Sequence, residues 1–465
     1  MCGIIGVIDF KKNINPTIIN NLVHDTYHRG PDHQNIYKNS FCNLGYTRLS
    51  ILDLSSKSNQ PFVSKNKDCI MFYNGEIYNF KYLKTFFNKD EYYGNGDGEV
   101  ILKLYRKFGE KFVDYLRGMF SICILDLKKK EFFLYRDRFG IKPLYFIDNF
   151  AKDRSFYFSS EIKPLLKTLK IKKAINYQTA FDFLYKDLSD CYDRTWFKDI
   201  YQLLPGQLIR INKKKIEKKF YYKLENNINE NIDNKKNEYY FENKISKLLN
   251  QNFKNHANSD VKTGYHMSSG ADSTLLATLN SLNNKKLSAF SFGFKNQKID
   301  ESNNAKEICK SLNINHDTLY FNEKNLEDQI FELSRVLEQP YSSLRILNTF
   351  NLYKYNKSLN YKVILDGSGG DEIASGYPYY IFPWYLDQIQ SNNEKNNEQS
   401  LKNILGKHES LNSLDYLMGS IQSFYNSGKS SNDGSKINLL LNKDFIETQK
   451  KKILKINLPF KSYLR

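Results

Sequence analysis

Short apolar and aromatic runs, separated by turn signals, fill the first 210 residues. Four of these runs are Cys69–Tyr73, Phe120–Leu125, Phe132–Tyr135 and Phe156–Phe158. Runs of this length and composition predict β-strands. The Asn74-Gly75 pair that follows the first run predicts a turn between strands. We therefore expect residues 1–210 to form a β-rich domain of layered sheets.

After residue 240 the pattern changes to strands that alternate with amphipathic helices. The strand candidates are Thr263–Met267, Leu287–Phe292 and Val363–Leu365, and the helix candidates are Asp272–Asn280 and residues 301–312. This alternation predicts a parallel sheet covered by helices, in a second domain over residues 241–465. Between the two patterns, residues 211–240 are polar and rich in Asn and Lys, which predicts a linker or an exposed loop.

The composition fits a two-domain protein of the cytoplasm. The chain has 465 residues, of which 40% are hydrophobic, so it can form more than one core. No apolar run reaches the length of a membrane span and no signal peptide is visible. The cysteines form no C-x-x-C pair, which argues against a zinc site and fits a reducing compartment. The six cysteines are Cys2, Cys42, Cys69, Cys123, Cys191 and Cys309.

The net charge of +18 raises the question of nucleic-acid binding. The lysines are spread along the whole chain among Asn, Ile and Tyr, and no nucleic-acid-binding motif accompanies them. We therefore predict small-molecule substrates and neither a nucleic-acid nor a membrane partner. The oligomeric state stays open, with a homodimer as one candidate.

Cys2, directly after the initiator methionine, is the first candidate for chemistry. Removal of Met1 would give one residue both a thiol and a free α-amine. The amine has an ordinary pKa near 8, so it can act as the base that activates the thiol. This combination is typical of an N-terminal nucleophile.

Several motifs follow Cys2 in a fixed order. They are His28-Arg29-Gly30-Pro31-Asp32, Arg48-Leu49-Ser50-Ile51, Asn74-Gly75-Glu76-Ile77-Tyr78-Asn79, Asp97-Gly98-Glu99 and the segment Arg136–Tyr145. Together they resemble the glutaminase domain of class II glutamine amidotransferases, specifically that of the asparagine synthetases. The resemblance implies an α+β N-terminal nucleophile fold, an αββα sandwich, over about the first 205 residues.

The resemblance also implies roles for these residues. Cys2 would attack the amide of glutamine, and the Asn74 side chain with the Gly75 backbone N–H would hold the oxyanion. Arg48 would bind the α-carboxylate of glutamine as a planar fork. Glu76 and Asp97, with Asn74, would complete the glutamine site on the α-ammonium side. We expect His28 and Arg29 to shape the site and not to react.

A second group of motifs indicates a nucleotide site. The loop Met267-Ser268-Ser269-Gly270-Ala271-Asp272-Ser273-Thr274 follows a predicted strand and opens a predicted helix. Small residues at a helix N-terminus suit a phosphate, and no lysine stands where a Walker A loop needs one. The loop resembles the pyrophosphate loop of ATP pyrophosphatases. The resemblance implies an α/β parallel-sheet domain of the adenine nucleotide α-hydrolase-like type.

The remaining nucleotide contacts come from the same resemblance. The backbone near Phe292 would recognise adenine, and Gly367 in Asp366-Gly367-Ser368-Gly369-Gly370-Asp371-Glu372 would approach the nucleotide. Asp272 and Asp371 would bind Mg²⁺. The expected ATP-binding residues are Met267, Ser268, Gly270, Asp272, Ser273, Phe292 and Gly367, and the expected cofactors are ATP and Mg²⁺.

The second domain departs from the family pattern at four places. Ser269 replaces a glycine of the pyrophosphate loop, which is acceptable where that position needs no positive φ. Ser368 replaces an acidic residue, and Asp366 replaces a serine, so the acceptor is in question. Family members also continue well beyond a segment like Leu458–Arg465, so we expect the second domain to be incomplete at its C-terminal end.

These observations predict a glutamine-dependent asparagine synthetase, an ATP-dependent carbon–nitrogen ligase. ATP would adenylate aspartate, and ammonia from glutamine would displace AMP. Two alternatives remain. One is a related amidotransferase for another carboxylate, such as a uronic acid in surface-polysaccharide synthesis, and the other is a degenerate homologue without catalysis.

Overall fold

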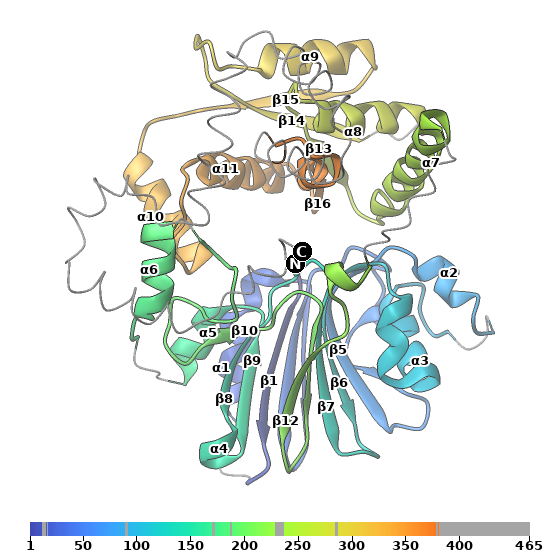
Figure 1. The fold of residues 1–465 in the computed structure, drawn as a ribbon, viewed down its shortest axis with the longest axis vertical. Helices are drawn as coiled ribbons and strands as arrows, with labels where there is room; N and C mark the ends of the chain where they lie inside the picture. Colours follow the sequence, from blue (N-terminus) through green and yellow to red (C-terminus); the bar gives the residue numbers. More distant parts are fainter. Residues whose placement is uncertain are drawn as a thin grey trace, which may run out of the picture. The chain divides into compact units, whose positions relative to one another are not determined.

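The N-terminal part of the computed structural model contains two six-stranded antiparallel sheets (Figure 1). The first has the order β10 (Tyr201–Gln202), β8 (Tyr145–Asn149), β9 (Ser155–Ser159), β1 (Gly3–Asp9), β3 (Cys42–Arg48), β2 (His33–Lys38). The second has the order β12 (Ile216–Phe220), β11 (Gln207–Ile211), β7 (Glu131–Arg136), β6 (Gly118–Asp126), β5 (Cys69–Ile77), β4 (Phe62–Val63). The four strand runs predicted here lie in β5, β6, β7 and β9, and these predictions are confirmed.

Side chains that alternate along each strand bind the two sheets and their helices into four layers. In β1, Ile4 and Ile8 belong to the core between the sheets, whereas Ile5 and Val7 pack on the other face with the helices α1 (Ile18–Asp25) and α5 (Ile162–Thr168). This is the period of two that a strand imposes. The αββα sandwich expected from the resemblance is therefore present.

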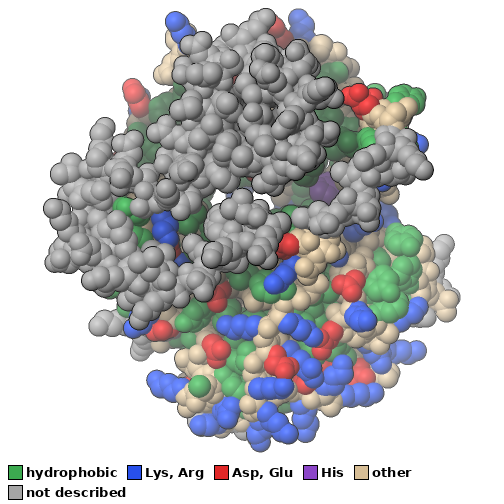
Figure 2. Space-filling model, viewed as in Figure 1, with side chains coloured by type: hydrophobic (Ala, Val, Ile, Leu, Met, Phe, Trp, Pro, Cys, Tyr) green, Lys and Arg blue, Asp and Glu red, His purple; other side chains and the backbone are tan. Residues whose placement is uncertain are grey.

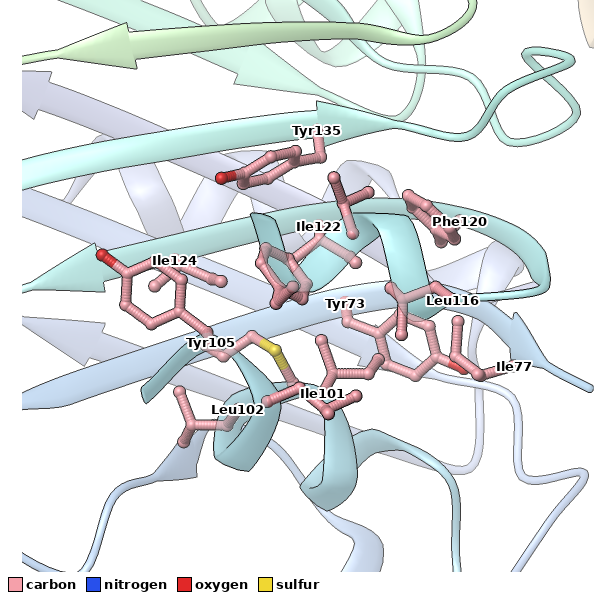
Figure 3. Close-up of a cluster of buried hydrophobic side chains, with 14 of the residues drawn as sticks. Tyr73, Ile77, Ile101, Leu102, Tyr105, Leu116, Phe120, Ile122, Ile124 and Tyr135 are labelled. Carbon is pink, nitrogen blue, oxygen red and sulfur yellow. The ribbon is translucent and has the colours of Figure 1, made fainter. Parts of the chain in front are cut away.

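The outer face of the second sheet is covered by α3 (Gly98–Phe108) and the 3₁₀ segment η4 (Gly109–Tyr115). Figure 3 shows Ile101 and Tyr105 of α3 pointing at Ile122 and Ile124 of β6, all of them buried. The other short helices that the structure describes in this part are η1 (Tyr27–Arg29), η2 (Ser56–Ser58), α2 (Phe80–Lys84), α4 (Phe150–Asp153), α6 (Tyr177–Lys186) and η5 (Leu224–Asn227).

The turn predicted at Asn74-Gly75 is wrong. Strand β5 continues through both residues to Ile77, and Asn74 and Gly75 pair with Ser121 and Phe120 of β6. A Cβ on Gly75 would lie 2.2 Å from the carbonyl oxygen of Met119. The glycine is therefore needed for the close approach of the neighbouring strand, a use that the pair of residue types alone does not distinguish from a turn.

The predicted parallel sheet is confirmed in the second half of the chain. Its order is β15 (His316–Tyr320), β14 (Ser288–Gly293), β13 (Thr263–His266), β16 (Val363–Leu365), and every neighbouring pair is parallel. The helices of this part are α7 (Glu238–His256), α8 (Ala271–Leu282), α9 (Ser302–Ser311), α10 (Leu326–Leu337), α11 (Arg345–Ser358) and α12 (Gly370–Ala374). The carboxyl ends of β13, β14 and β16 meet at one edge of the sheet, which is where such folds bind ligands.

The structure describes residues 1–11, 15, 17–88, 92–169, 173–186, 188–227, 237–283, 287–377 and 380. Two compact units divide the chain. The first comprises Met1–Asn176, Tyr192–Ser269 and Ser273–Asp366, and the second comprises Tyr177–Cys191, Gly270–Asp272 and Gly367–Arg465. The domain boundaries at residues 210 and 240 remain predictions. Strand β12 lies inside the segment predicted as linker or loop, and Leu458–Arg465 lies outside the described residues.

Charged side chains of both signs are interspersed on the face that Figure 2 displays, with Lys and Arg in blue next to Asp and Glu in red. Among the described residues, no helix combines the length and the apolar character that crossing a bilayer requires.

Candidate active site

The Cys2 thiol lies at the end of the ladder between β1 and β3. The register of this ladder pairs Gly3 with Thr47, which brings the residues before β1 close to those after β3. The backbone nitrogen of Leu49 donates a hydrogen bond to Cys2 Sγ over 3.4 Å, and the Tyr46 hydroxyl lies 3.7 Å from the same sulfur. The sheet register, not a loop, therefore fixes the candidate nucleophile.

Arg29 holds the backbone of Cys2 from the other side. Its Nε donates to the carbonyl oxygen of Cys2 over 2.9 Å, and its Nη1 donates to Glu161 over 2.8 Å. The Nε2 atom of His28 also lies 3.0 Å from Glu161. Although Glu161 is partly buried, these two partners keep its pKa below the ordinary value. Arg29 thus contacts Cys2 directly and His28 is linked to it through Glu161; that the two residues shape the site stays a prediction.

The Asn74 side chain is the clearest sign of a ligand position. Asn74 is 1% exposed, and its amide nitrogen Nδ2 makes no hydrogen bond to any described residue. An unsatisfied buried donor costs about 1–3 kcal/mol, so native proteins rarely leave one without a purpose. A donor that forms a hydrogen bond to the oxygen of a bound substrate has such a purpose.

Glu76 and Asp97 form an acidic pair near Asn74. Asp97 is buried at the start of α3, and its Oδ2 accepts hydrogen bonds from the Tyr73 hydroxyl and from the backbone nitrogen of Ile77. Burial raises the pKa of Asp97, and burial together with the charge of Asp97 raises the pKa of Glu76 well above its ordinary value. A bound ammonium would favour the ionised form of both groups.

Arg48 stands at the end of β3, and its guanidinium already has partners within the protein. The Nη1 atom donates to Ser55 O and Asn59 Oδ1 over 2.9 and 2.7 Å, and Nη2 donates to Asp53 O over 2.5 Å. Arg48 therefore holds the segment 52–59 in this structure. A carboxylate that used the same fork would have to share or replace these carbonyl oxygens.

The predicted pyrophosphate loop joins β13 to α8. The hydroxyl of Ser273 donates to Ser268 O over 2.9 Å and lies 2.9 Å from the Ser268 hydroxyl, which closes the loop on itself. The Met267 backbone nitrogen donates to Phe290 O over 2.8 Å, which ties the loop to β14. Ser269 has no positive φ, and its hydroxyl donates to Glu301. The serine that replaces the family glycine is therefore accommodated.

The second glycine-rich loop lies against Asp272. A Cβ on Gly370 would lie 2.2 Å from Asp272 Oδ2, so the absence of a side chain allows the carboxylate to reach this loop. Asp371 follows Gly370 directly, and its Oδ1 lies close to Gly376. Carboxylate oxygens are the ligands that Mg²⁺ prefers, and it commonly takes one or two of them together with substrate phosphates. The donor set therefore fits Mg²⁺, although the described residues contain no cluster of three or more metal-ligating side chains.

Two further residues lie at this edge of the sheet, one expected near adenine and one that bears on the acceptor. Phe292, expected near adenine, is half-buried in β14 and packs edge-on against Phe294 and Phe321. The Asp366 carboxylate, which stands in place of a serine, accepts a hydrogen bond from the Tyr353 hydroxyl over 3.2 Å.

Comparison with known proteins matches both halves of the chain. Residues 1–222 match the glutamine amidotransferase domain family, and residues 244–448 match the asparagine synthase family. A putative glutamine-hydrolysing asparagine synthetase of Methanocaldococcus jannaschii is 34% identical over 84% of this chain and 78% of its own length. The chain belongs to the family of glutamine-hydrolysing asparagine synthetases. It is thus a member of a family of ATP-dependent ligases.

Other asparagine synthetases match over a smaller share of their own length. Asparagine synthetase 2 of Bacillus subtilis is 31% identical over 82% of this chain. The matched region covers 53% of the length of that relative. Among solved structures, the glutamine phosphoribosylpyrophosphate amidotransferase of B. subtilis has 13% sequence identity, covers 70% of each chain and has a TM-score of 0.36.

Two residues of this asparagine synthetase family site, Glu161 and Lys142, are not identified by the sequence motifs alone. Glu161 has no motif around it and is found only through its contacts with His28 and Arg29. Lys142 lies within the motif Arg136–Tyr145, but nothing in that motif says where its side chain goes. In the structure Lys142 is buried, and its Nζ lies 3.2 Å from Met1 Sδ, next to the candidate nucleophile.

Proposed function

We propose that this chain is a glutamine-dependent asparagine synthetase. It would convert aspartate, ATP and glutamine into asparagine, AMP, pyrophosphate and glutamate. The observation that carries the glutaminase half is the buried Asn74 Nδ2 atom, which has no hydrogen-bond partner among the described residues and lies on the strand next to Gly75 and Glu76. Family membership supports the ATP-dependent half.

In the glutaminase half, Cys2 would attack the side-chain amide of glutamine once Met1 is removed. The thiol proton passes to the α-amine, and the bond from Sγ to the carbonyl carbon forms as the oxygen becomes an oxyanion. Asn74 Nδ2 is the donor for that oxyanion, a contribution commonly worth about 3–4 kcal/mol. Collapse of the intermediate releases ammonia and leaves a thioester, which water hydrolyses to glutamate.

Three charged groups would place the glutamine for this attack. Glu76 and Asp97 suit its α-ammonium, and Arg48 suits its α-carboxylate. Burial of the two acids makes their carboxylates costly without a cation. Glutamine would supply that cation, so the acidic pair favours a substrate with an α-ammonium over a simple amide.

In the ATP-dependent half, the loop from Ser268 to Ser273 would hold the pyrophosphate, with the backbone near Phe292 on adenine and Gly367 close to the nucleotide. Asp272 and Asp371 would hold Mg²⁺, which neutralises phosphate charge when it is bound. The acceptor carboxylate attacks the α-phosphorus of ATP, and ammonia then displaces AMP. Ammonia must reach this intermediate before bulk water protonates it.

Pyrophosphate release from ATP with Mg²⁺ and glutamine, with and without aspartate, tests this proposal. Aspartate-dependent release with asparagine formed is expected. Asp272→Asn should remove most of that release and leave glutamine hydrolysis unchanged, because Asp272 serves only the nucleotide. Equal pyrophosphate yield in the variant would contradict the assignment of Asp272.

A second acceptor is favoured by one observation. Ser368 offers a hydroxyl where the family pattern has a carboxylate, and Asp366 places a carboxylate two residues earlier, bonded to Tyr353. Pyrophosphate release that a uronic acid stimulates and aspartate does not would select this alternative.

A further inference from the structure

Lys142 is held in a loop that two buried residues fix in place. Asp137 is 0% exposed, and its Oδ2 accepts a hydrogen bond from the Lys142 backbone nitrogen over 3.0 Å. Arg136 donates from Nε to the Lys142 carbonyl oxygen over 3.0 Å and from Nη1 to Leu203 O over 2.5 Å. The motif that contains Lys142 therefore presents its side chain from a rigid backbone.

The Lys142 ammonium has an unusually weak partner for a buried cation. Lys142 is 6% exposed, and among the described residues its Nζ hydrogen-bonds only to Met1 Sδ, at 3.2 Å. A thioether sulfur is a poor acceptor, and buried cations normally have a carboxylate or several carbonyl partners. Removal of Met1 would take even this partner away and leave the ammonium beside the new N-terminus.

The charges around this point come from several elements. Arg29 on η1 is the second cation, but its charge is paired with Glu161 at 2.8 Å. Burial lowers the pKa of Lys142, and the charges of Glu76 on β5, Cys2 and Asp137 act in the opposite direction. The Cys2 charge also raises the pKa of the chain amine. Among the described residues, Arg29 therefore has a carboxylate within ion-pair distance, whereas Lys142 has none.

We propose that Lys142 is a positioning residue for catalysis, whose ammonium faces the α-amine of Cys2 after Met1 is removed and keeps that amine in its neutral, basic form. The inference rests on the proposed glutaminase function. It gives the buried lysine a purpose that its present partner does not.

The electrostatics of the unprocessed chain support this assignment. Burial lowers the pKa of the Met1 amine to about 5; the charges of Cys2 and Glu161 oppose this shift, and those of Arg29 and Lys142 act in the same direction as burial. A neighbouring cation disfavours protonation of an amine, because the two positive charges repel each other. The neutral amine is the form that can accept the thiol proton, so a neighbouring cation that lowers the pKa of the amine increases the fraction that can act as the base.

Lys142→Met tests the proposal, since methionine has a similar length and no charge. The protein is produced with Met1 removed and with ¹⁵N-cysteine. The labelled amine of Cys2 then differs from the labelled backbone amides of the other cysteines. We expect the pH at which this nitrogen titrates, followed by NMR, to rise by about one unit in the variant. The acid limb of kcat/KM for glutamine hydrolysis should rise with it, which lowers kcat/KM at about pH 6 up to about tenfold.

Two variants control the experiment. Lys142→Arg keeps the charge and should titrate like the wild type, and Lys128→Met removes an exposed lysine of the same sandwich and should change neither readout. Lys142→Gln serves in place of the methionine variant if that protein does not fold, as judged by circular dichroism. An amine that titrates at the wild-type pH in a folded neutral variant overturns the role of Lys142. Wild-type protein that hydrolyses no glutamine would contradict the proposed function, and the NMR titration would still decide the role of the lysine.

Discussion

The two halves of the chain differ in how completely their described residues bury apolar surface. In the N-terminal sandwich, long side chains such as Phe72, Phe133 and Phe158 are at most 1% exposed and lie in continuous cores. Around the parallel sheet, the buried clusters among the described residues are small and include alanines and a cysteine. Helices α7 and α10 keep large apolar side chains exposed, among them Tyr239, Ile245, Phe331 and Val336.

This difference indicates which half can act without further support. The sandwich contains its own core and all the residues proposed for glutamine hydrolysis. The parallel-sheet half leaves apolar faces that the described residues do not cover. We therefore expect glutamine hydrolysis to be the more robust of the two proposed activities.

The largest expected effect comes from Cys2→Ala, which separates the halves chemically. Glutamine hydrolysis should fall about 10⁴-fold, because the nucleophile is lost. Pyrophosphate release supported by ammonia should remain, since it uses the other site. The exposed Cys191 offers a matched control, and Cys191→Ala should leave both activities unchanged. Loss of both activities in folded Cys2→Ala protein would contradict the two-site mechanism.

A pair of isoleucine variants measures the difference in packing directly. Ile122 is fully buried beneath α3, so Ile122→Ala should lower the free energy of unfolding by about 2–5 kcal/mol. Ile245 on α7 is 56% exposed, so Ile245→Ala should change the free energy of unfolding by about 0.5 kcal/mol or less. Urea unfolding followed by circular dichroism compares the two. Equal destabilisation would mean that α7 is buried in solution.

The smallest expected effect concerns the affinity for glutamine. Burial and the Asp97 charge raise the pKa of Glu76, so its carboxylate gains a proton at a higher pH than an exposed glutamate does. KM for glutamine should therefore increase as the pH falls through that pKa. Glu76→Gln should raise KM about tenfold near neutral pH and remove this pH dependence. Glu217→Gln, at a surface ion pair with Lys215, should leave KM unchanged.

The sequence predicted those parts of the structure that depend on local pattern. The apolar run Cys69–Tyr73 is enough to predict a strand, and in β5 its side chains are buried on both faces. The parallel strands at Thr263, Leu287 and Val363 lie within one residue of their predicted starts. The motif residues of the nucleotide loops also lie at the ends of the strands that were expected to carry them.

Other parts depend on contacts between distant residues, and the sequence does not reveal them. Asn74-Gly75 has the composition of a turn, but its place beside Met119 in the sheet decides its conformation. The partners of Arg48 come from a loop whose path no local rule gives. The burial of Lys142 likewise depends on the hydrogen bond from its backbone nitrogen to the buried Asp137 carboxylate.

The strand conformation of Asn74-Gly75 has a consequence for the chemical ageing of the protein. In a mobile segment the glycine nitrogen of an Asn-Gly pair attacks the asparagine side chain, and the resulting succinimide opens to aspartate or isoaspartate. In β5 the pair is held by the ladder to β6, and Asn74 is buried. Unfolding would release the pair to this reaction, and the product would carry a negative charge where the oxyanion is proposed to form. The fold thus protects the proposed oxyanion donor from deamidation, and each unfolding event would expose the proposed glutaminase activity to irreversible loss.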